Sequence, residues 1–192
     1  MTGFLAVRPR EIDWKGAAMY WYLPWVWTVS FWDGLVHQGQ LVAMPLELDD
    51  IDFAAELHSE AFARPWSGDE FAALLSQAGT FGFVVRRVGD TRHPPVGVVL
   101  ARTMAGEAEI LTIVVSKKSR RQGVGRLLMD AVLQRLHADR TEALFLEVDE
   151  ENTGALALYR RLRFAEVGRR PAYYVDASGR KTSALVLKRA LR

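Results

Sequence analysis

Residues 110–126 read Ile110-Leu111-Thr112-Ile113-Val114-Val115-Ser116-Lys117-Lys118-Ser119-Arg120-Arg121-Gln122-Gly123-Val124-Gly125-Arg126, and this stretch decides the fold. Its aliphatic beginning belongs to a strand predicted over 108–115. A helix is predicted over about 124–137, because apolar residues recur every four positions from Leu128 to Leu136. The loop 116–126 between them holds five basic residues and no acidic one.

This basic loop has the chemistry of an anion-binding site. Gly123 and Gly125 let backbone N–H groups come close to a ligand. The first turn of the following helix leaves N–H groups unpaired, and the helix dipole favours an anion there. The loop is therefore predicted to bind a pyrophosphate. A basic run of this kind also fits an ordinary solvated loop.

Two other phosphate motifs do not match the loop. A Walker loop needs Gly-x-x-x-x-Gly-Lys-Ser/Thr, and the chain has none here. A dinucleotide-binding fingerprint needs a third glycine, and Leu128 holds that position. The loop also follows the third strand of a hairpin series rather than opening a βαβ unit.

The surrounding sequence alternates short helices and strands. Ser67 is predicted to cap a helix that runs to Leu75, with Glu70 completing a capping box. The other predicted helices are 51–62 and 152–162, the latter capped by Asn152 or Thr153; the other predicted strands are 45–48, 81–88, 95–103, 143–149, 164–168 and 184–187. This order indicates a mixed α/β sheet with helices packed on it.

Composition excludes several classes of site. The chain has 192 residues, 49% of them apolar and 25% charged, and a net charge of +2. This suits one soluble domain and gives no sign of a nucleic-acid coat protein. With no cysteine there can be no disulfide, thiolate zinc site or cysteine nucleophile, which fits a reducing compartment. The four histidines lack metal-ligand spacing, so no metal is expected.

Residues 1–43 differ from the rest. Five of the six tryptophans lie between Trp14 and Trp32, and an apolar run of 13 residues covers 19–31. That run is shorter than the ~20 residues needed to span a bilayer, and it contains Pro24. The segment could be an extra strand or helix, an interfacial anchor, or an artefact of a start assigned upstream of Met44. We favour the third interpretation, with the functional domain at 44–192.

Two side chains are candidates for proton transfer in a catalytic site. Glu147 lies within the apolar strand 143–149, where burial would raise its pKa, although an outward-facing edge glutamate fits equally well. Tyr159 lies on the next helix, where a tyrosine is usually a core residue. A phenol has a pKa of about 10, so it stays protonated at neutral pH and has a proton to give to a leaving group.

The combined motifs resemble those of the GNAT superfamily. The pattern Arg120-x-x-Gly123-x-Gly125 is similar to its acetyl-CoA motif. The stretch Leu146-Glu147-Val148…Asn152…Ala155…Leu158-Tyr159…Phe164 resembles the RimI-type ribosomal-protein-alanine N-acetyltransferases. So do Phe62-Ala63-Arg64-Pro65-Trp66-Ser67, as a Pro-Trp-Ser turn, and Pro171-Ala172-Tyr173-Tyr174 with Asp176-Ala177-Ser178-Gly179, as a Tyr-Tyr hairpin. The resemblance covers about residues 44–190.

The resemblance implies a fold, a reaction and a set of site residues. The fold would be a twisted, mostly antiparallel sheet with one parallel, splayed strand pair and helices on both faces. Acetyl-CoA would donate its acetyl group to a protein N-terminal amine, with Glu147 as base and Tyr159 as acid. Coenzyme contacts would come from Ile113, Val114, Val115, Arg120, Arg121, Gln122, Gly123, Val124, Gly125, Arg126 and Asn152, and acceptor contacts from Trp66, Tyr173 and Tyr174.

The same resemblance implies a cytoplasmic enzyme that acts on the N-terminal alanine of a small-subunit ribosomal protein. It would have no direct nucleic-acid partner and no membrane association, and a monomer is favoured. Two alternatives stay open: a small-molecule amine or lysine as acceptor, and a non-catalytic acetyl-CoA-binding module. One residue departs from the family pattern. Arg163 stands where a glycine usually ends the helix, and it is expected to strain or lengthen that turn.

Overall fold

The structure is a computed structural model that describes residues 40–88, 94–175 and 180–192. The Trp-rich segment up to residue 39 lies outside the described residues. So do residues 89–93 of the predicted hairpin loop and residues 176–179 of the predicted Tyr-Tyr hairpin.

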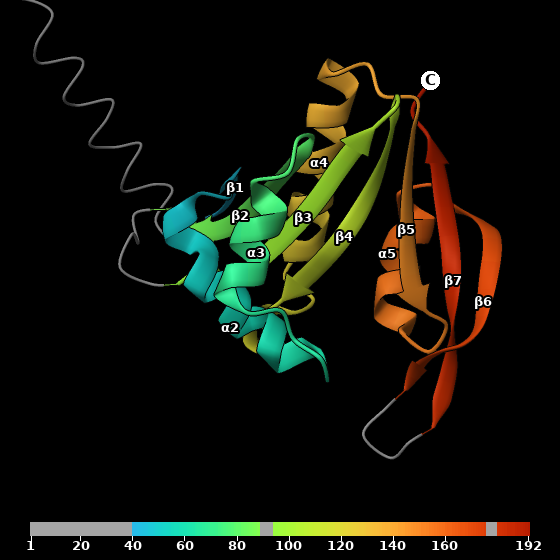
Figure 1. The fold of residues 1–192 in the computed structure, drawn as a ribbon, viewed down its shortest axis with the longest axis horizontal. Coiled ribbons are helices and arrows are strands. Elements are labelled where there is room, and N and C mark those ends of the chain that lie inside the picture. The colour runs from blue at the N-terminus through green and yellow to red at the C-terminus, as the bar shows by residue number, and fades with distance from the viewer. Residues whose placement is uncertain (1–39, 89–93, 176–179) are drawn as a thin grey trace, which may run out of the picture. The chain divides into compact units, whose positions relative to one another are not determined.

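The described strands form one mixed sheet in the order β1-β2-β3-β4-β5-β7-β6 (Figure 1). All neighbouring strands are antiparallel except β4 and β5, which are parallel. The strands are β1 Leu41–Pro45, β2 Thr80–Arg87, β3 Gly97–Met104, β4 Glu107–Val115, β5 Ala143–Asp149, β6 Ala165–Val175 and β7 Lys181–Ala190. The predicted fold class, a mostly antiparallel sheet with one parallel pair, is confirmed.

Helices cover both faces of the sheet, as predicted. The helices are α2 Ile51–Ala61, α3 Gly68–Leu75, α4 Val124–Ala138 and α5 Thr153–Arg161, with short 3-10 turns η1 Leu48–Asp50 and η2 Lys117–Ser119. Alternating residues of β3 show the two layers: Val98 packs with α2 and α3, and Val99 packs with α4. Figure 1 shows α3 in front of β3 and α4 behind it. The capping box of Ser67 and Glu70 is present at the start of α3.

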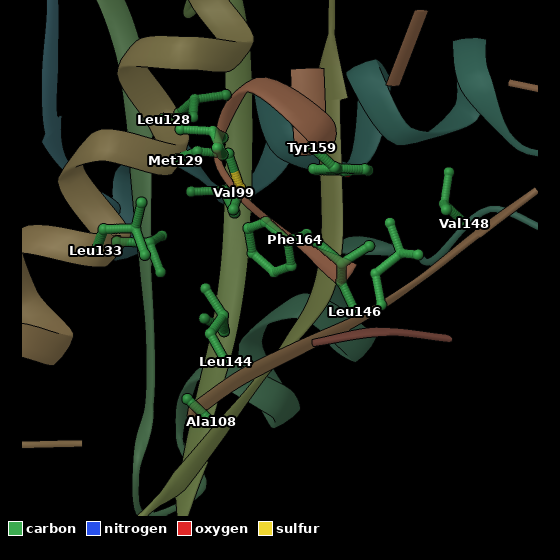
Figure 2. Packing of buried hydrophobic residues seen from close by; sticks show 14 of the residues in the cluster. Val99, Ala108, Leu128, Met129, Leu133, Leu144, Leu146, Val148, Tyr159 and Phe164 are labelled. Atoms are coloured by element: carbon green, nitrogen blue, oxygen red, sulfur yellow. The ribbon is translucent and has the colours of Figure 1, made fainter. Parts of the chain in front are cut away.

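The α4 side of the sheet holds the larger core. Leu128 and Met129 of α4 and Leu144 of β5 are fully buried in this core. Figure 2 shows Tyr159 and Phe164 in the same cluster, so the end of α5 is packed into this core. Truncation of a side chain as deeply buried as Leu128 to alanine costs about 2–5 kcal/mol.

Three predicted strands have other bounds in the structure. The strand predicted at 45–48 is instead β1 at Leu41–Pro45, because Glu47 and Asp50 exchange hydrogen bonds that close a 3-10 turn. The predicted domain boundary between residues 43 and 44 therefore lies inside β1. Strands β6 and β7 run beyond the predicted 164–168 and 184–187. The prediction stopped short because Pro171 interrupts the added part of β6, and the added part of β7 begins with the polar residues 181–183.

The parallel strands β4 and β5 pair over only three residues each. The paired residues begin at Glu107 and Ala143 and end at Glu109 and Phe145. Directly after this, β4 has a bulge at Leu111, where its register with β3 shifts. Figure 1 shows the two strands diverging from there toward their C-terminal ends, with α5 beside β5. This divergence leaves one edge of β4 open where the predicted coenzyme residues lie.

Candidate active site

The basic loop presents backbone N–H groups rather than side chains at the start of α4. Arg121 and Gly123 have positive φ angles of 61° and 85°, so the chain turns sharply before the helix. Gly123 is the N-cap residue, no side-chain hydrogen bond caps the helix, and its first turn holds no acidic residue. The first amides of α4 are therefore free of side-chain acceptors, and the local field favours an anion. This arrangement fits a pyrophosphate.

The side chains of the loop brace it. The Gln122 amide donates to the Lys118 carbonyl at 3.0 Å, and Arg126 pairs with Asp130 at 2.7 Å. Gly125 lies against α5: a Cβ added there would be 3.3 Å from Leu158 Cδ2. The glycine thus lets α4 and α5 approach each other at the mouth of the loop.

The end of β4 offers a second set of backbone groups. Ile113, Val114 and Val115 pair with β3 on one side, and no β5 residue pairs with them on the other. A strand edge of this kind can hydrogen-bond an extended ligand that carries amides. The predicted pantetheine contacts at Ile113–Val115 therefore lie where such an edge is open. Next to them, the Thr112 hydroxyl is buried and has no hydrogen-bond partner among the described residues.

Glu147 lies on β5, facing away from the core that Leu146 and Val148 enter. Its side chain is 29% exposed, which lies between the buried and the outward-facing positions that the sequence allowed. Its Oε1 atom is 3.0 Å from the Arg170 guanidinium of β6, a contact that no local sequence pattern predicts. A half-buried carboxylate on a rigid strand can accept a proton from an amine that enters the gap between the diverging strands β4 and β5.

Tyr159 is buried on α5 and packs against the Phe164 ring, with 5.7 Å between ring centroids. Burial, and next the nearby Tyr174, raise its pKa above the ordinary value. Burial also raises the pKa of Tyr174 to about 12, and the charges of Glu147, Tyr173 and Asp149 add to this. Tyr174 therefore lies within electrostatic reach of both candidate proton-transfer residues, a link that sequence spacing could not reveal.

Tyr173 and Tyr174 lie at a bulge in β6. Arg170 pairs with Ala184 of β7 and Tyr174 with Thr182, so three residues of β6 face one residue of β7. The extra residues are accommodated by Ala172, which has a φ of 54°. Tyr173 is half exposed, and its ring lies 5.1 Å from that of Tyr174, at right angles to it.

Asn152, predicted to contact the coenzyme, is the N-cap of α5. Its Oδ1 atom accepts the Ala155 amide at 3.1 Å. The side chain is exposed, and the cap leaves its amide nitrogen available to a ligand.

Trp66 lies in the turn between α2 and α3. Its ring stacks on His58 at 4.8 Å, and its backbone N–H donates to His58 Nδ1 at 3.0 Å. Phe62 stacks on the other side of His58 at 4.3 Å. Burial lowers the pKa of His58 to about 4, with Glu70 acting in the opposite direction, so the ring is neutral and can accept. Sequence reasoning missed His58, because a single histidine on a helix usually has no special role.

Arg163, which stands where the family usually has a glycine, lies in the turn that ends α5. The residue adopts a φ of 62°, the left-handed conformation expected of the missing glycine. The Phe164 amide donates to the Tyr159 carbonyl and the Arg163 amide to the Arg160 carbonyl. These are the two bonds of a Schellman motif, so the turn keeps its ordinary length and Arg163 bears the strain.

Within 40–88, 94–175 and 180–192, no three His, Asp or Glu side chains are grouped so as to hold a metal ion. None of the helices described in these ranges is long and apolar enough to cross a membrane.

The fold, the open edge of β4 and the amides before α4 define a class, the acyl-CoA-dependent transferases. Residues 51–164 match the acetyltransferase (GNAT) family, and the chain belongs to that family. It is an acetyl-CoA-dependent N-acetyltransferase, as predicted.

Three relatives were compared by sequence. The uncharacterized protein ML0378 of Mycobacterium leprae is 36% identical over 133 residues, which are 68% of this chain but only 36% of that protein. The [Ribosomal protein bS18]-alanine N-acetyltransferase of Escherichia coli K12 is 29% identical over 73% of this chain and 92% of its own length. The N-alpha-acetyltransferase RimI of Mycobacterium tuberculosis is 34% identical over 65% of this chain and 78% of its own.

Two solved structures are similar in fold. The crystal structure of the Escherichia coli ribosomal-protein-S18-alanine N-acetyltransferase gives a TM-score of 0.71 with 27% identity, over 79% of this chain and 94% of that one. Arabidopsis thaliana NAA60 in complex with acetyl-CoA gives a TM-score of 0.69 with 17% identity, over 79% and 98%. The second likeness concerns the fold alone.

Proposed function

We propose that this enzyme acetylates the N-terminal α-amine of a protein that begins with alanine, a small-subunit ribosomal protein being its natural acceptor. One observation carries the proposal. The likeness to the Escherichia coli [Ribosomal protein bS18]-alanine N-acetyltransferase extends over 92% of that enzyme. In this chain, moreover, Glu147 of β5 and Tyr159 of α5 both lie within electrostatic reach of Tyr174 of β6.

The coenzyme supplies a reactive acetyl thioester. The amides from Arg121 to Arg126 would hold its pyrophosphate, the open edge of Ile113–Val115 its amide-bearing arm, and Asn152 would contact it from α5. No carboxylate occupies the first turn of α4, so nothing there repels the phosphates.

Glu147 and Tyr159 divide the proton transfers. The Glu147 carboxylate accepts the proton that the amine loses as its nitrogen bonds to the acetyl carbon. An α-amine has a pKa of about 7.7–8.0, so a modest base suffices. The Tyr159 phenol gives its proton to the departing sulfur.

The raised pKa of Tyr159 keeps the phenol protonated until the thiolate leaves. Such a phenol is a weaker acid, and the same dry surroundings also raise the pKa of a thiol, which limits the difference between the pKa values of donor and acceptor. The side chains of Trp66, Tyr173 and Tyr174 would frame the acceptor on the other side of the gap. We place this reaction in the cytoplasm, with the enzyme acting as a monomer.

The test is a direct assay. The purified protein is incubated with acetyl-CoA and a hexapeptide that has an N-terminal alanine and one internal lysine, and the products are mapped by mass spectrometry. Acetylation should fall on the α-amine, and a peptide with a formylated N-terminus should not react. Equal acetylation of the blocked peptide would contradict the proposal and favour a lysine acceptor.

A further inference from the structure

The polar end of the β5–β7–β6 face is built as a series of ion pairs and hydrogen bonds. Arg169 pairs with Glu150, and Arg180 pairs with Glu151. Asp149 accepts hydrogen bonds from the Thr182 hydroxyl and the Glu151 amide. Each carboxylate from Asp149 to Glu151 thus has a partner that plays no part in the proposed chemistry.

Glu147 differs from these carboxylates, because it is the proposed catalytic base and is itself paired with a cation, Arg170. Arg170 reaches from β6 across the small residue Ala184 of β7, and its Nη2 atom lies 3.0 Å from the carboxylate. The Arg170 side chain is 59% exposed, whereas that of Glu147 is 29% exposed. An ion pair this exposed adds little net stability, so a competing carboxylate can take the guanidinium away.

The guanidinium is held at the mouth of the proposed acceptor site. Its carbon lies 5.7 Å from the centre of the Tyr173 ring, which is half exposed on the β6 bulge. Stacking on the ring keeps the cation beside the path of an entering chain. The planar guanidinium can bind a carboxylate through two parallel hydrogen bonds, which makes an acidic side chain its best partner.

We propose that Arg170 is a specificity-determining residue that favours acceptors with a carboxylate side chain at their second or third residue. The inference rests on the proposed function, because it takes Glu147 as the base. An acidic acceptor side chain takes Arg170 as its partner and thereby frees the Glu147 carboxylate for the α-amine. In an extended chain the second and third residues lie within about 3–7 Å of the first, so their side chains reach the guanidinium.

The experiment measures kcat/KM at saturating acetyl-CoA with the full chain. The substrates are hexapeptides with N-terminal alanine and either Glu, Gln or Lys at the second or the third position. For the wild type, Glu should be preferred over Gln by about three- to tenfold at one of these positions. The preference should vanish in Arg170→Gln and turn toward Lys in Arg170→Glu.

Arg169→Gln is the matched control, because it makes the same change in charge one residue away, at the partner of Glu150. This variant should keep the preference for Glu. Arg170→Lys should retain part of it, since a point charge remains. Thermal unfolding of each variant checks that the fold is intact.

Two failures can be told apart. If the wild type acetylates the Glu and Gln peptides equally, or if the preference survives in Arg170→Gln, the role of Arg170 is overturned and the proposed function stands. If no alanine peptide is acetylated although acetyl-CoA binds, the proposed function is overturned and this inference falls with it.

Discussion

The proposed coenzyme side and the proposed acceptor side of the gap between β4 and β5 are built differently. On the proposed coenzyme side the candidate ligand groups are backbone amides, positioned by Gly123 and by the unpaired edge of β4. On the proposed acceptor side the candidate groups are side chains of β5 and β6, such as Glu147 and Arg170, which the sheet brings together. The first kind of site is local in sequence. The second exists only after three strands have paired.

The difference predicts separable defects. Changes on the acceptor side should alter turnover and acceptor preference, and they should leave coenzyme binding intact. Substitutions that add a side chain next to the backbone on the coenzyme side should weaken coenzyme binding first.

The largest expected effect comes from the two proton-transfer residues. Glu147→Gln and Tyr159→Phe should each lower kcat by about 10²–10⁴, because each removes a general acid or base while keeping the shape of the side chain. Steady-state assays with an alanine peptide measure this. Glu166→Gln, an exposed glutamate on β6, is the control and should be fully active. Wild-type turnover in both site variants would remove the mechanism.

The next effect concerns His58, which ties the acceptor-side turn to α2 through one side chain. Its folded-state pKa of about 4 lies below the unfolded value of 6.5, so the unfolded chain binds the proton first. Stability from this residue is complete above pH 6.5 and is lost as the pH falls toward 4, by up to about 3 kcal/mol.

Urea unfolding of the wild type and His58→Phe at pH 7 and pH 4.5 measures this contribution as a difference. The phenylalanine variant should be less stable at pH 7, because the Trp66 amide loses its acceptor, yet it should depend less on pH. His137→Gln, at an exposed position, should keep the wild-type pH dependence. An identical pH dependence in wild type and His58→Phe would show that His58 does not titrate in this way.

A smaller effect tests whether backbone geometry alone sets the ends of the helices that flank the coenzyme side. Arg163→Gly should raise the free energy of unfolding by about 0.5–1 kcal/mol, because glycine adopts the positive φ without a Cβ clash. Arg140, with a φ of 57°, ends α4 in the same way, so Arg140→Gly should behave alike. Destabilisation by both substitutions would mean that the arginine side chains contribute more than their backbone strain costs.

The smallest effect concerns Thr112, beside the bulge in β4. Thr112→Val should leave stability unchanged or raise it by up to about 1 kcal/mol, because the buried hydroxyl has no partner among the described residues. Calorimetry measures the change. A loss of stability would mean that the hydroxyl makes a hydrogen bond within the folded protein.

The same contrast explains what the sequence could predict. The basic loop before α4, the Ser67 cap and the Asn152 cap depend on residues within a few positions of each other, and local patterns predicted these elements. The Arg170 contact and the added lengths of β6 and β7 depend on pairing across the sheet, which no local pattern in those residues indicates. His58 was missed for a related reason: its role comes from two aromatic rings that only the folded turn places around it.

Coenzyme binding should depend on the space around the backbone at the start of α4 and be independent of the charges on the acceptor side. Isothermal titration with acetyl-CoA tests this most directly, on Gly125→Val and on the double variant Glu147→Gln with Arg170→Gln. Valine at 125 would push Leu158 of α5 away from α4, so its Kd should rise about tenfold or more. The double variant should bind acetyl-CoA as the wild type does. An equal loss of affinity in the double variant, or wild-type affinity in Gly125→Val, would contradict the account.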